Sequence, residues 1–473
     1  MPHIVVVGAG IAGLATALML TKQGHEVTVL ERDPGPVPDT PAQSWENWER
    51  GSVMQFRQPH LLHAGGWRVV EDQLPEVAQA VRMAGGARWN RLSWMPAAIK
   101  DRAPRPGDER WDAVNARRPV LEHAFAAAAE GTMDVRRGVR VTGLLSDRPR
   151  RVSGVRLADG AALRADLVID ATGRRSPLPG WLAAIGAGQP AEEAQERGFT
   201  YYSRFFRTRD GGPAPSFGGD LYTALDSCSI LTGPGDAGTW SVTVFINSRD
   251  HQLKSLRARA NWDRLLGACP LHERLLAGLE PITDVLPASG IVNRLRELVV
   301  DGAPVATGII AVGDSWACTN PSAGRGLTLA LLHAAITAET VGEHLGDPLA
   351  LALAHHRKTS ERLLPWYRNS AQIDQVRLAQ ISAAVDGHLE PATGSSGTGR
   401  PDPVAALMRN FAVGMNWDAD VFRAYCEMVA MLALPGQILA RPGMTEQINA
   451  AAAGRQLPRP PGPSRTELLA LLT

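Results

Sequence analysis

The feature that most constrains this chain is a glycine-rich turn near its start. The β-branched run of residues 4–7 is followed at once by Gly8-Ala9-Gly10-Ile11-Ala12-Gly13 and then by an apolar, alanine-rich segment that Gly24 ends. A second apolar run, residues 27–30, leads to Glu31. The order predicts a strand, a turn, a helix and a second strand, which is a βαβ unit carrying a GxGxxG turn.

Each part of this turn has a physical task in binding a nucleotide. Gly8 permits the tight turn, Gly10 lets the backbone approach a pyrophosphate, and Gly13 allows the helix to pack closely on the strand. The helix N-terminus faces the phosphates with free N–H groups and the positive end of its dipole. Glu31 is placed to accept hydrogen bonds from a ribose diol. The turn predicts a dinucleotide site, and by itself it fits FAD and NAD equally.

Two later segments favour FAD. Residues 166–173 read as a strand that ends in a turn of small residues, and residues 308–314 read as a second strand that ends in an acid. The latter leads through Pro-Ser-Ala-Gly-Arg-Gly, residues 321–326, into an apolar helix over 327–338. With the first turn, these segments closely resemble the FAD-dependent monooxygenase superfamily of the p-hydroxybenzoate hydroxylase type. That superfamily includes aromatic hydroxylases, squalene and polyether epoxidases and flavin-dependent halogenases, and the resemblance covers roughly residues 1–345.

The resemblance implies roles for particular residues. It places Asp314 on the ribityl chain of FAD, Pro321 along the flavin ring, and the Gly324–Gly326 segment beside the pyrimidine end of the ring. A helix that begins there stabilises the negative charge of reduced flavin near N1. Arg57 and Arg118 match basic positions near FAD, although each could instead pair with a carboxylate. The predicted FAD contacts are Gly8, Gly10, Ile11, Ala12, Gly13, Glu31, Arg32, Arg57, Arg118, Ala171, Thr172, Gly173, Gly313, Asp314, Pro321, Gly324, Arg325 and Gly326.

The expected fold is α/β, with a Rossmann-like FAD-binding domain, an antiparallel-sheet substrate domain and a helical C-terminal region. The FAD-binding domain is expected over 1–190, with an insertion at about 61–114, and again over 301–345. Short β-branched or alternating runs between Gly/Pro turns predict the antiparallel sheet within 191–300. Residues 346–473 show a helical pattern, which the Gly/Ser/Pro stretch from Asp386 to Pro403 interrupts.

No single catalytic side chain can be assigned from the sequence. Weak candidates are His60, Tyr201 and Tyr222, and the wider set of pocket candidates from the predicted sheet adds Tyr202, Arg204 and Phe206. Alternate members of this wider set must instead be core or solvent-facing. His60 and His63 could share a helical face, but no third ligand cluster supports a metal site, and none is predicted. Clustered tryptophans suit either an apolar substrate pocket or ordinary core packing: Trp45, Trp48, Trp67, Trp89, Trp94 and Trp111.

The chain departs from its relatives at several positions. Thr172-Gly173 stands where the hydroxylases usually carry Asp-Gly, a pair that helps them use FAD and NADPH together. NADPH or NADH is therefore expected as the electron donor either directly or through a flavin reductase. Neither the lysine in the N-terminal third nor the Trp-x-Trp-x-Ile-Pro motif of the halogenases is present. Cys318 is expected to be a small packing residue rather than a reactive thiol.

Composition narrows the partners. Lys plus Arg number 49 and Asp plus Glu 48, so no positive excess suggests nucleic acid. The four cysteines are widely spaced and form no CxxC, which suggests neither disulfides nor zinc and fits a reducing cytoplasm. No apolar run approaches the roughly 18 residues of a membrane span. A small organic molecule and O2 are the expected partners.

The expected activity is monooxygenation. In the superfamily that the chain resembles, reduced FAD and oxygen form a flavin C4a-hydroperoxide that hydroxylates or epoxidises a small apolar or aromatic substrate, here presumed to belong to specialised metabolism. The alternative is an FAD-dependent dehydrogenase or reductase that transfers no oxygen.

Overall fold

A five-stranded parallel sheet organises the N-terminal part of the molecule. The structure, a computed structural model, describes residues 2–195, 198–209, 221–387 and 403–473. The strand order is β20-β9-β1-β2-β5, and all neighbours are parallel. These strands are β1 (His3–Val7), β2 (Glu26–Glu31), β5 (Asp134–Arg137), β9 (Leu167–Asp170) and β20 (Ile309–Ala311). Strand β2, the next along the chain, pairs with one side of β1, whereas β9, which comes much later, pairs with the other side. The direction in which strands are added to the sheet therefore reverses at β1.

Both faces of this sheet are covered, which explains the unbroken apolar run of β1. Ile4 and Val6 belong to one hydrophobic core, whereas Val5 and Val7 belong to another, as a period of two requires. Helix α1 packs between α9 and α5 on one face, and the β6-β7-β8 meander lies against β9. Their bounds are α1 (Ile11–Lys22), α5 (Arg118–Ala129), α9 (Gly326–His344), β6 (Val141–Arg148), β7 (Arg151–Leu157) and β8 (Ala162–Arg164).

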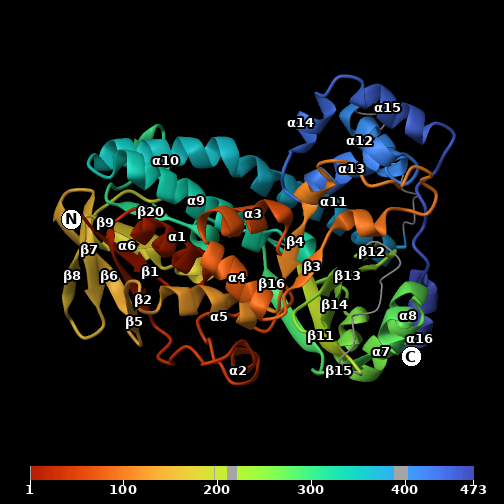
Figure 1. Cartoon of the computed structure of the whole chain (residues 1–473), viewed down its shortest axis with the longest axis horizontal. Helices are drawn as coiled ribbons and strands as arrows, with labels where there is room; N and C mark the ends of the chain where they lie inside the picture. Colours follow the sequence, from red (N-terminus) through yellow and green to blue (C-terminus); the bar gives the residue numbers. More distant parts are fainter. Residues whose placement is uncertain (1, 196–197, 210–220, 388–402) are drawn as a thin grey trace.

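A six-stranded antiparallel sheet forms the second large layer, at the right of the parallel sheet in Figure 1. Its order is β12-β13-β14-β11-β15, and β16 also pairs with β11. The short runs expected to form a sheet here, within residues 199–206, 221–225, 229–232 and 239–246, are confirmed as strands β11 to β14. The strands are β11 (Phe199–Thr208), β12 (Tyr222–Ala224), β13 (Cys228–Pro234), β14 (Thr239–Asn247), β15 (Leu279–Pro281) and β16 (Leu286–Ile291).

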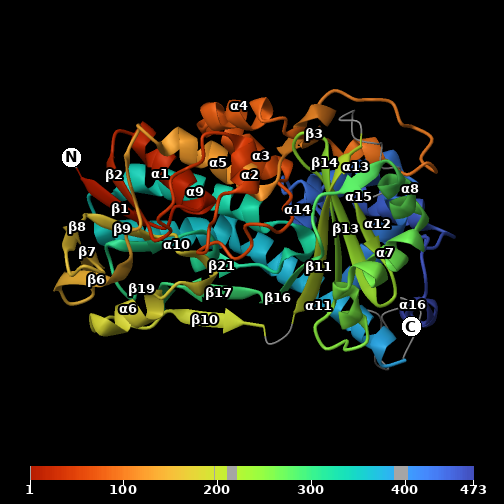
Figure 2. The same cartoon turned by 90° about the horizontal axis from the view of Figure 1, so that it is seen from below.

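Smaller elements join the two large sheets. A three-stranded sheet β10-β17-β21 runs between them, as Figure 2 shows from below. The segment expected to be sheet alone also carries helices α7 and α8. The connecting elements are α2 (Pro41–Glu46), α3 (Ala64–Gln73), α4 (Pro75–Met83), β3 (Ala87–Trp89), β4 (Ala113–Asn115), α6 (Leu178–Ala184), β10 (Ala191–Ala194), α7 (Arg259–Gly267), α8 (Pro270–Ala277), β17 (Arg294–Glu297), β18 (Val299–Val300), β19 (Ala303–Pro304) and β21 (Ala317–Cys318).

The C-terminal region is helical, as expected. Helix α10 packs on α9, α11 contacts β14, and α16 packs against α7. A separate small core joins α12, α13, α14 and α15. Much of the expected Gly/Ser/Pro interruption, residues 388–402, lies outside the described residues. The bounds are α10 (Pro348–Arg362), α11 (Leu364–Val385), α12 (Pro403–Gly414), α13 (Ala419–Val429), α14 (Pro435–Leu439), α15 (Met444–Ala452) and α16 (Arg465–Leu472).

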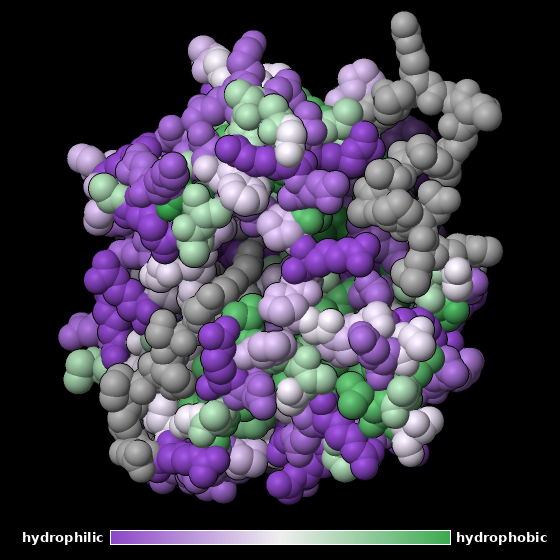
Figure 3. All heavy atoms as spheres, turned by 90° about the vertical axis from the view of Figure 1, so that its right-hand side faces the viewer, coloured by the Kyte–Doolittle hydropathy of each residue, from purple (hydrophilic) through white to green (hydrophobic). Residues whose placement is uncertain are grey.

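The surface of this C-terminal end is mixed in character. Figure 3 shows hydrophilic and hydrophobic side chains interspersed over the described part of that face.

Among the helices that the structure describes, none is both long enough and apolar enough to cross a membrane.

Candidate functional site

Three loops meet at the carboxyl edge of the parallel sheet, after β1, β9 and β20. A Cβ atom added to Gly8 would lie 2.5 Å from the carbonyl oxygen of Ala171, and Gly8 has a φ of +109°. A Cβ atom on Gly13 would lie 2.0 Å from the carbonyl oxygen of Gly8. On Gly313, whose φ is +59°, it would lie 2.8 Å from Cβ of Ala12. Only glycine allows the segments to approach so closely.

Gly10 differs from these glycines because its missing side chain faces open space. No heavy atom lies within 4 Å of a Cβ atom built there, and its φ of −80° suits any residue. Helix α1 begins at the next residue, Ile11, and no side chain caps it. The N–H of Leu14 donates to the Gly10 carbonyl, so the N–H groups before it have no acceptor within the helix. An open glycine backbone at an uncapped helix N-terminus fits a pyrophosphate.

Glu31 is buried at the end of β2, and its carboxylate is nearly saturated. Oε2 accepts from the Ala9 N–H and from Arg50 Nη2, both at 2.9 Å, and Oε1 accepts from the Asp33 N–H at 2.9 Å. The Ser52 hydroxyl lies 3.3 Å from Oε1, but its single hydrogen has a shorter contact with Asp33. Because a carboxylate has about four acceptor positions, Oε1 retains one that fits a ribose hydroxyl. Arg32, its neighbour, is exposed.

Arg50 is a site residue that sequence reasoning missed. Its buried guanidinium bonds Glu31 and Glu122 at 2.9 Å each, Asp33 at 3.2 Å, and the carbonyl of Ala9 at 3.1 Å. It thereby ties the glycine turn to β2 and α5. The only signal in the sequence was that a basic residue follows β2 at a short distance. Because arginine is abundant in this chain, that residue did not stand out.

Arg118, one of the two predicted arginines, lies in this network. Its Nε donates to Glu122 Oε1 at 2.7 Å, and its Nη1 donates to His60 Nε2 at 3.1 Å. Arg57 instead donates to the Trp48 carbonyl at 3.2 Å and lies over the Trp45 ring. Among the described residues, no contact joins Arg57 to the glycine turn, so its contact with FAD stays a prediction.

His60 orients Arg118. Its Nδ1–H donates to the Gln58 carbonyl at 2.8 Å, which leaves Nε2 to accept from Arg118. Burial, and secondarily the charge of Arg118, lowers the pKa of His60 to about 3. The neutral imidazole therefore persists at neutral pH, where it serves as an acceptor for the guanidinium and not as an acid.

The expectation that His60 and His63 share a helical face is wrong. Helix α3 begins only at Ala64, and His63 is its N-cap residue in extended conformation. The sequence pattern misled because a spacing of three also occurs in extended chain. His63 is buried and its Nε2 donates to the Ala323 carbonyl at 3.1 Å, beside the Pro321–Gly326 loop. Within the described ranges, no group of three or more His, Cys, Asp or Glu residues is arranged to hold a metal ion.

Asp314 follows β20 and is half-buried in a basic surrounding. Burial raises the pKa of its carboxyl, and the nearby charges of Arg118, Arg174 and Arg294 oppose that shift. Its neighbour Ser315 accepts the Gly173 N–H at 2.8 Å, which joins the loops after β9 and β20.

Thr172 turns its hydroxyl inward. Both its N–H and its Oγ1 bond Asp170 Oδ1, at 3.0 and 2.5 Å. Asp170 is fully buried and accepts from Ser176 as well, so the Thr172 hydroxyl stabilises the loop. The side chain at position 172 is therefore uncharged.

The loop from Pro321 to Gly326 precedes α9. Gly324 has a φ of +65°, and a Cβ atom on it would lie 3.2 Å from that of Leu61. The buried Arg325 side chain turns to α11, where Nη1 donates to Asn369 Oδ1 at 2.6 Å. Burial lowers the pKa of Arg325 to about 10. The Arg325 guanidinium is thus engaged with α11. Only the backbone of Arg325 remains for the predicted contact with the flavin.

A cleft of about 400 Å³ lies beside this loop. Asn320, immediately before Pro321, and Asp374 from α11 contribute its buried polar groups, and Phe199 and Leu378 contribute apolar walls. The complete lining is Ala194, Gln195, Gly198, Phe199, Asn320, Asp374, Gln375 and Leu378. Neither Asn320 nor Asp374 was predicted from the sequence.

The pocket candidates on β11 and β12 divide between the two faces of the antiparallel sheet. The hydroxyl of Tyr201 donates to Asn320 Oδ1 at the wall of the cleft, and Tyr222 packs against Phe245 on the same face. Tyr202, Arg204 and Phe206 instead face α7, where Phe206 stacks on Trp262, the Arg204 guanidinium lies over that ring, and the Tyr202 carbonyl accepts from its indole N–H. They are the alternate members that were expected to be core or solvent-facing, because successive residues of a strand point to opposite faces.

Core packing accounts for most of the clustered tryptophans. Trp48, Trp67, Trp89 and Trp111 are buried in the main core, and none of the six lines the cleft. Cys318 is likewise buried, and burial raises the pKa of its thiol far above the usual range, as expected of a packing residue.

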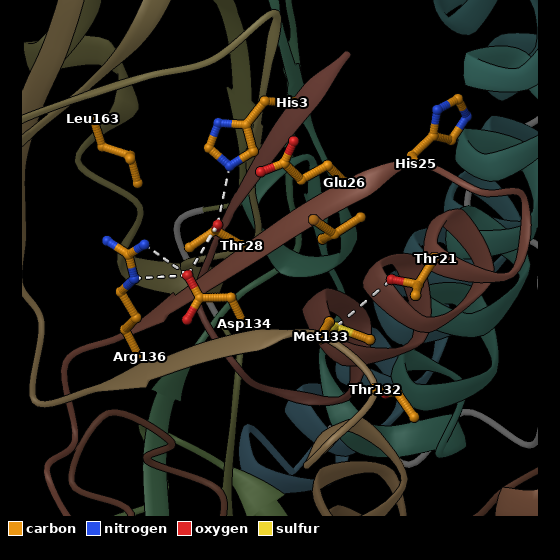
Figure 4. A pocket seen from close by; sticks show the side chains of 11 residues that line it. His3, Thr21, His25, Glu26, Thr28, Thr132, Met133, Asp134, Arg136 and Leu163 are labelled. Carbon is orange, nitrogen blue, oxygen red and sulfur yellow. Dashed lines mark hydrogen bonds and ion pairs between the residues drawn. The ribbon is translucent and has the colours of Figure 1, made fainter. Parts of the chain in front are cut away.

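A second cavity of about 400 Å³ lies at the opposite, amino edge of the parallel sheet. Figure 4 shows His3, Thr28, Asp134 and Arg136 there, linked by hydrogen bonds and an ion pair. None of the predicted site residues lines it.

Replacing Asp314 by alanine should weaken FAD binding about ten- to a hundredfold, because a hydrogen bond to a charged acceptor contributes roughly 1.5–3 kcal/mol. Fluorescence titration of FAD into the cofactor-free protein measures this. Asp72→Ala, on the exposed side of α3, is the control. Unchanged affinity in a folded Asp314→Ala variant would show that Asp314 does not contact the cofactor.

Comparison with known proteins gives three findings. A family model described as FAD dependent oxidoreductase matches residues 3–48. The chain is 31% identical to Protein Rv3254 of Mycobacterium tuberculosis (strain ATCC 25618 / H37Rv), over 70% of this chain and 71% of that protein. It is 26% identical to the FAD-dependent monooxygenase nsrK of Aspergillus novofumigatus, over 70% of this chain and 64% of nsrK.

A solved structure shares the fold. The structure of Pseudomonas aeruginosa PqsL in complex with 2-aminobenzoylacetate superposes with a TM-score of 0.61. The superposition covers 81% of this chain and 99% of PqsL at 19% identity. At that identity the likeness concerns the arrangement of sheets and helices.

Proposed function

The chain belongs to the FAD-dependent monooxygenase superfamily and is an oxidoreductase, and from this premise we propose that it hydroxylates or epoxidises a small organic substrate. One oxygen atom of O2 enters the substrate and the other leaves as water, at the expense of two electrons from NADPH or NADH. The observation that carries the proposal is the cleft beside the Pro321–Gly326 loop, the segment that follows the Gly313-Asp314 turn along the chain. The complex of PqsL with 2-aminobenzoylacetate supports a substrate of similar size.

FAD, when bound, supplies the electron transfer and the activation of oxygen. The residues of this chain bind and orient the cofactor and the substrate. The N-terminus of α1 and Gly10 receive the pyrophosphate, and Glu31 receives the ribose through its remaining acceptor position. The N-terminus of α9 offers its positive dipole end to negative charge at the flavin ring. Phe199 and Leu378 exclude water from the cleft.

The electron donor is NADPH or NADH, acting directly or through a flavin reductase. The Thr172 hydroxyl is engaged with Asp170, so position 172 offers no charged side chain to a nicotinamide cofactor. We expect NADPH or NADH to reduce the flavin slowly in the absence of substrate. Fast reduction of the flavin should need bound substrate or a flavin reductase. Such gating suits an enzyme that uses oxygen, because reduction without substrate would waste electrons.

The test measures oxygen uptake and the fate of labelled oxygen. The FAD-loaded protein is supplied with ¹⁸O2, a panel of small aromatic ketones and phenols, and NADPH or NADH with and without a flavin reductase. We expect substrate-dependent O2 uptake and a product that gains one ¹⁸O atom. A product that loses two hydrogens without gaining oxygen, with electrons passing to an artificial acceptor, would establish the dehydrogenase alternative instead.

A further inference from the structure

The cleft beside the Pro321–Gly326 loop contains a buried hydrogen-bond donor that has no partner. Asn320 is 2% exposed, and its Oδ1 accepts from the hydroxyl of Tyr201. Its backbone N–H donates to Asn293 Oδ1 at 2.7 Å. Its Nδ2 has no hydrogen-bond partner among the described residues, and it lies beside Gly198, another residue that lines the cleft, because a Cβ atom added there would be 3.0 Å away. A buried donor without a partner costs free energy unless a ligand satisfies it.

A carboxylate lines the same cleft. Asp374, from α11, is 3% exposed; Asn293 Nδ2 donates to its Oδ2 at 2.7 Å, and the Ser322 hydroxyl donates to its Oδ1. Since a carboxylate has about four acceptor positions, about two remain. Asn293 binds both Asn320 and Asp374, so it fixes the two groups relative to each other.

We propose that Asn320 and Asp374 are the recognition pair for a substrate that carries a hydroxyl group next to a carbonyl group. The Asn320 Nδ2 donates to the carbonyl oxygen, and Asp374 accepts from the hydroxyl. The apolar body of the substrate lies against Phe199 and Leu378. Tyr201 acts as a positioning residue, because its bond to Oδ1 turns the Asn320 Nδ2 toward the cleft. This assignment rests on the proposed function only in naming the bound molecule the substrate.

Asp374 also makes recognition depend on pH. Burial raises the pKa of its carboxyl to about 6, against the opposing effects of Ser322, Asn293 and the Arg325 charge. Tyr201 also faces Asp374, and burial raises the pKa of its hydroxyl well above its usual value, so it stays neutral. Asp374 is therefore protonated below about pH 6 and loses acceptor strength. Affinity for the hydroxyl-bearing ligand should rise as the pH passes upward through 6 and then level off.

The test uses three probes of one shape: 2-hydroxyacetophenone, 2-methoxyacetophenone and acetophenone. Binding to the FAD-loaded protein is followed by the change in the flavin absorbance spectrum, without turnover. Wild type should bind 2-hydroxyacetophenone at least tenfold more tightly than the other two. Asp374→Asn and Asn320→Leu should each lose that preference and retain FAD, and Asp374→Asn should also lose the rise near pH 6. Asp386→Asn, which removes an exposed carboxylate from the end of the same helix, should bind like wild type.

Any of three results would overturn the assignment. The first is equal preference for the hydroxy ketone in wild type and Asp374→Asn, and the second is an unchanged pH profile in that variant. The third is the absence of any preference in wild type. None of them depends on oxygen transfer. The ¹⁸O experiment can therefore fail while this binding result stands, and the reverse also holds.

Discussion

Replacing Gly10 by alanine should lower the affinity for FAD about 100-fold, equivalent to about 2.7 kcal/mol, while the protein stays folded. No heavy atom of the protein lies within 4 Å of the added methyl group, and a φ of −80° suits alanine. The methyl group instead occupies the space through which the pyrophosphate approaches the backbone. FAD titration into the cofactor-free protein gives the affinity, and urea unfolding of the same protein gives the stability.

Two other glycines make this result specific. Gly13→Ala places its methyl 2.0 Å from the Gly8 carbonyl oxygen, so it should destabilise the cofactor-free protein as well as abolish binding. Gly267→Ala, at the end of α7, also meets open space. It should leave FAD affinity unchanged and should raise the free energy of unfolding by at most about 1 kcal/mol, because alanine favours the helix more than glycine does. If Gly10→Ala bound FAD as tightly as wild type, the pyrophosphate could not lie over this turn.

The second large effect is expected at Arg50. Arg50→Met should lower the free energy of unfolding of the cofactor-free protein by about 3–5 kcal/mol, because it leaves the buried Glu31 carboxylate without its ion-pair partner and leaves Glu122 paired with Arg118 alone. The side chains of Arg50, Glu31 and Glu122 are 1%, 3% and 0% exposed. FAD affinity should fall too, since Arg50 holds Glu31 and the Ala9 carbonyl in place. Urea unfolding followed by tryptophan fluorescence measures the stability.

Lys22→Met is the matched control for Arg50→Met. Lys22 pairs with Glu76 at 2.8 Å, but both side chains are more than 40% exposed. Breaking such a pair should cost less than about 1 kcal/mol. Equal effects of the two substitutions would mean that the Arg50 cluster contributes no more than a surface ion pair.

Local patterns in the chain were enough to predict the elements of the nucleotide-binding edge. The run of β1, the glycine turn, α1 and β2 are neighbours in sequence, and each depends on interactions within a few residues. The strands β9 and β20 were recognised in the same way, from short apolar runs that end in turns. The strands of the antiparallel sheet were found from alternation, but the pattern leaves open which of its two faces meets the cleft. Tyr201 and Tyr202 therefore looked alike, and only packing against α7 separated them.

By itself the sequence determined the class of fold and the glycine turn, because a strand, a positive φ and an amphipathic helix are properties of short stretches of chain. The tertiary structure alone decided which polar side chains meet. Arg50 reaches Glu122 across 72 positions, and Asp374 reaches Asn293 across 81. Such pairs form because burial forces distant charged and polar groups to satisfy one another. The spacing of residues along the chain does not encode which partner each will find.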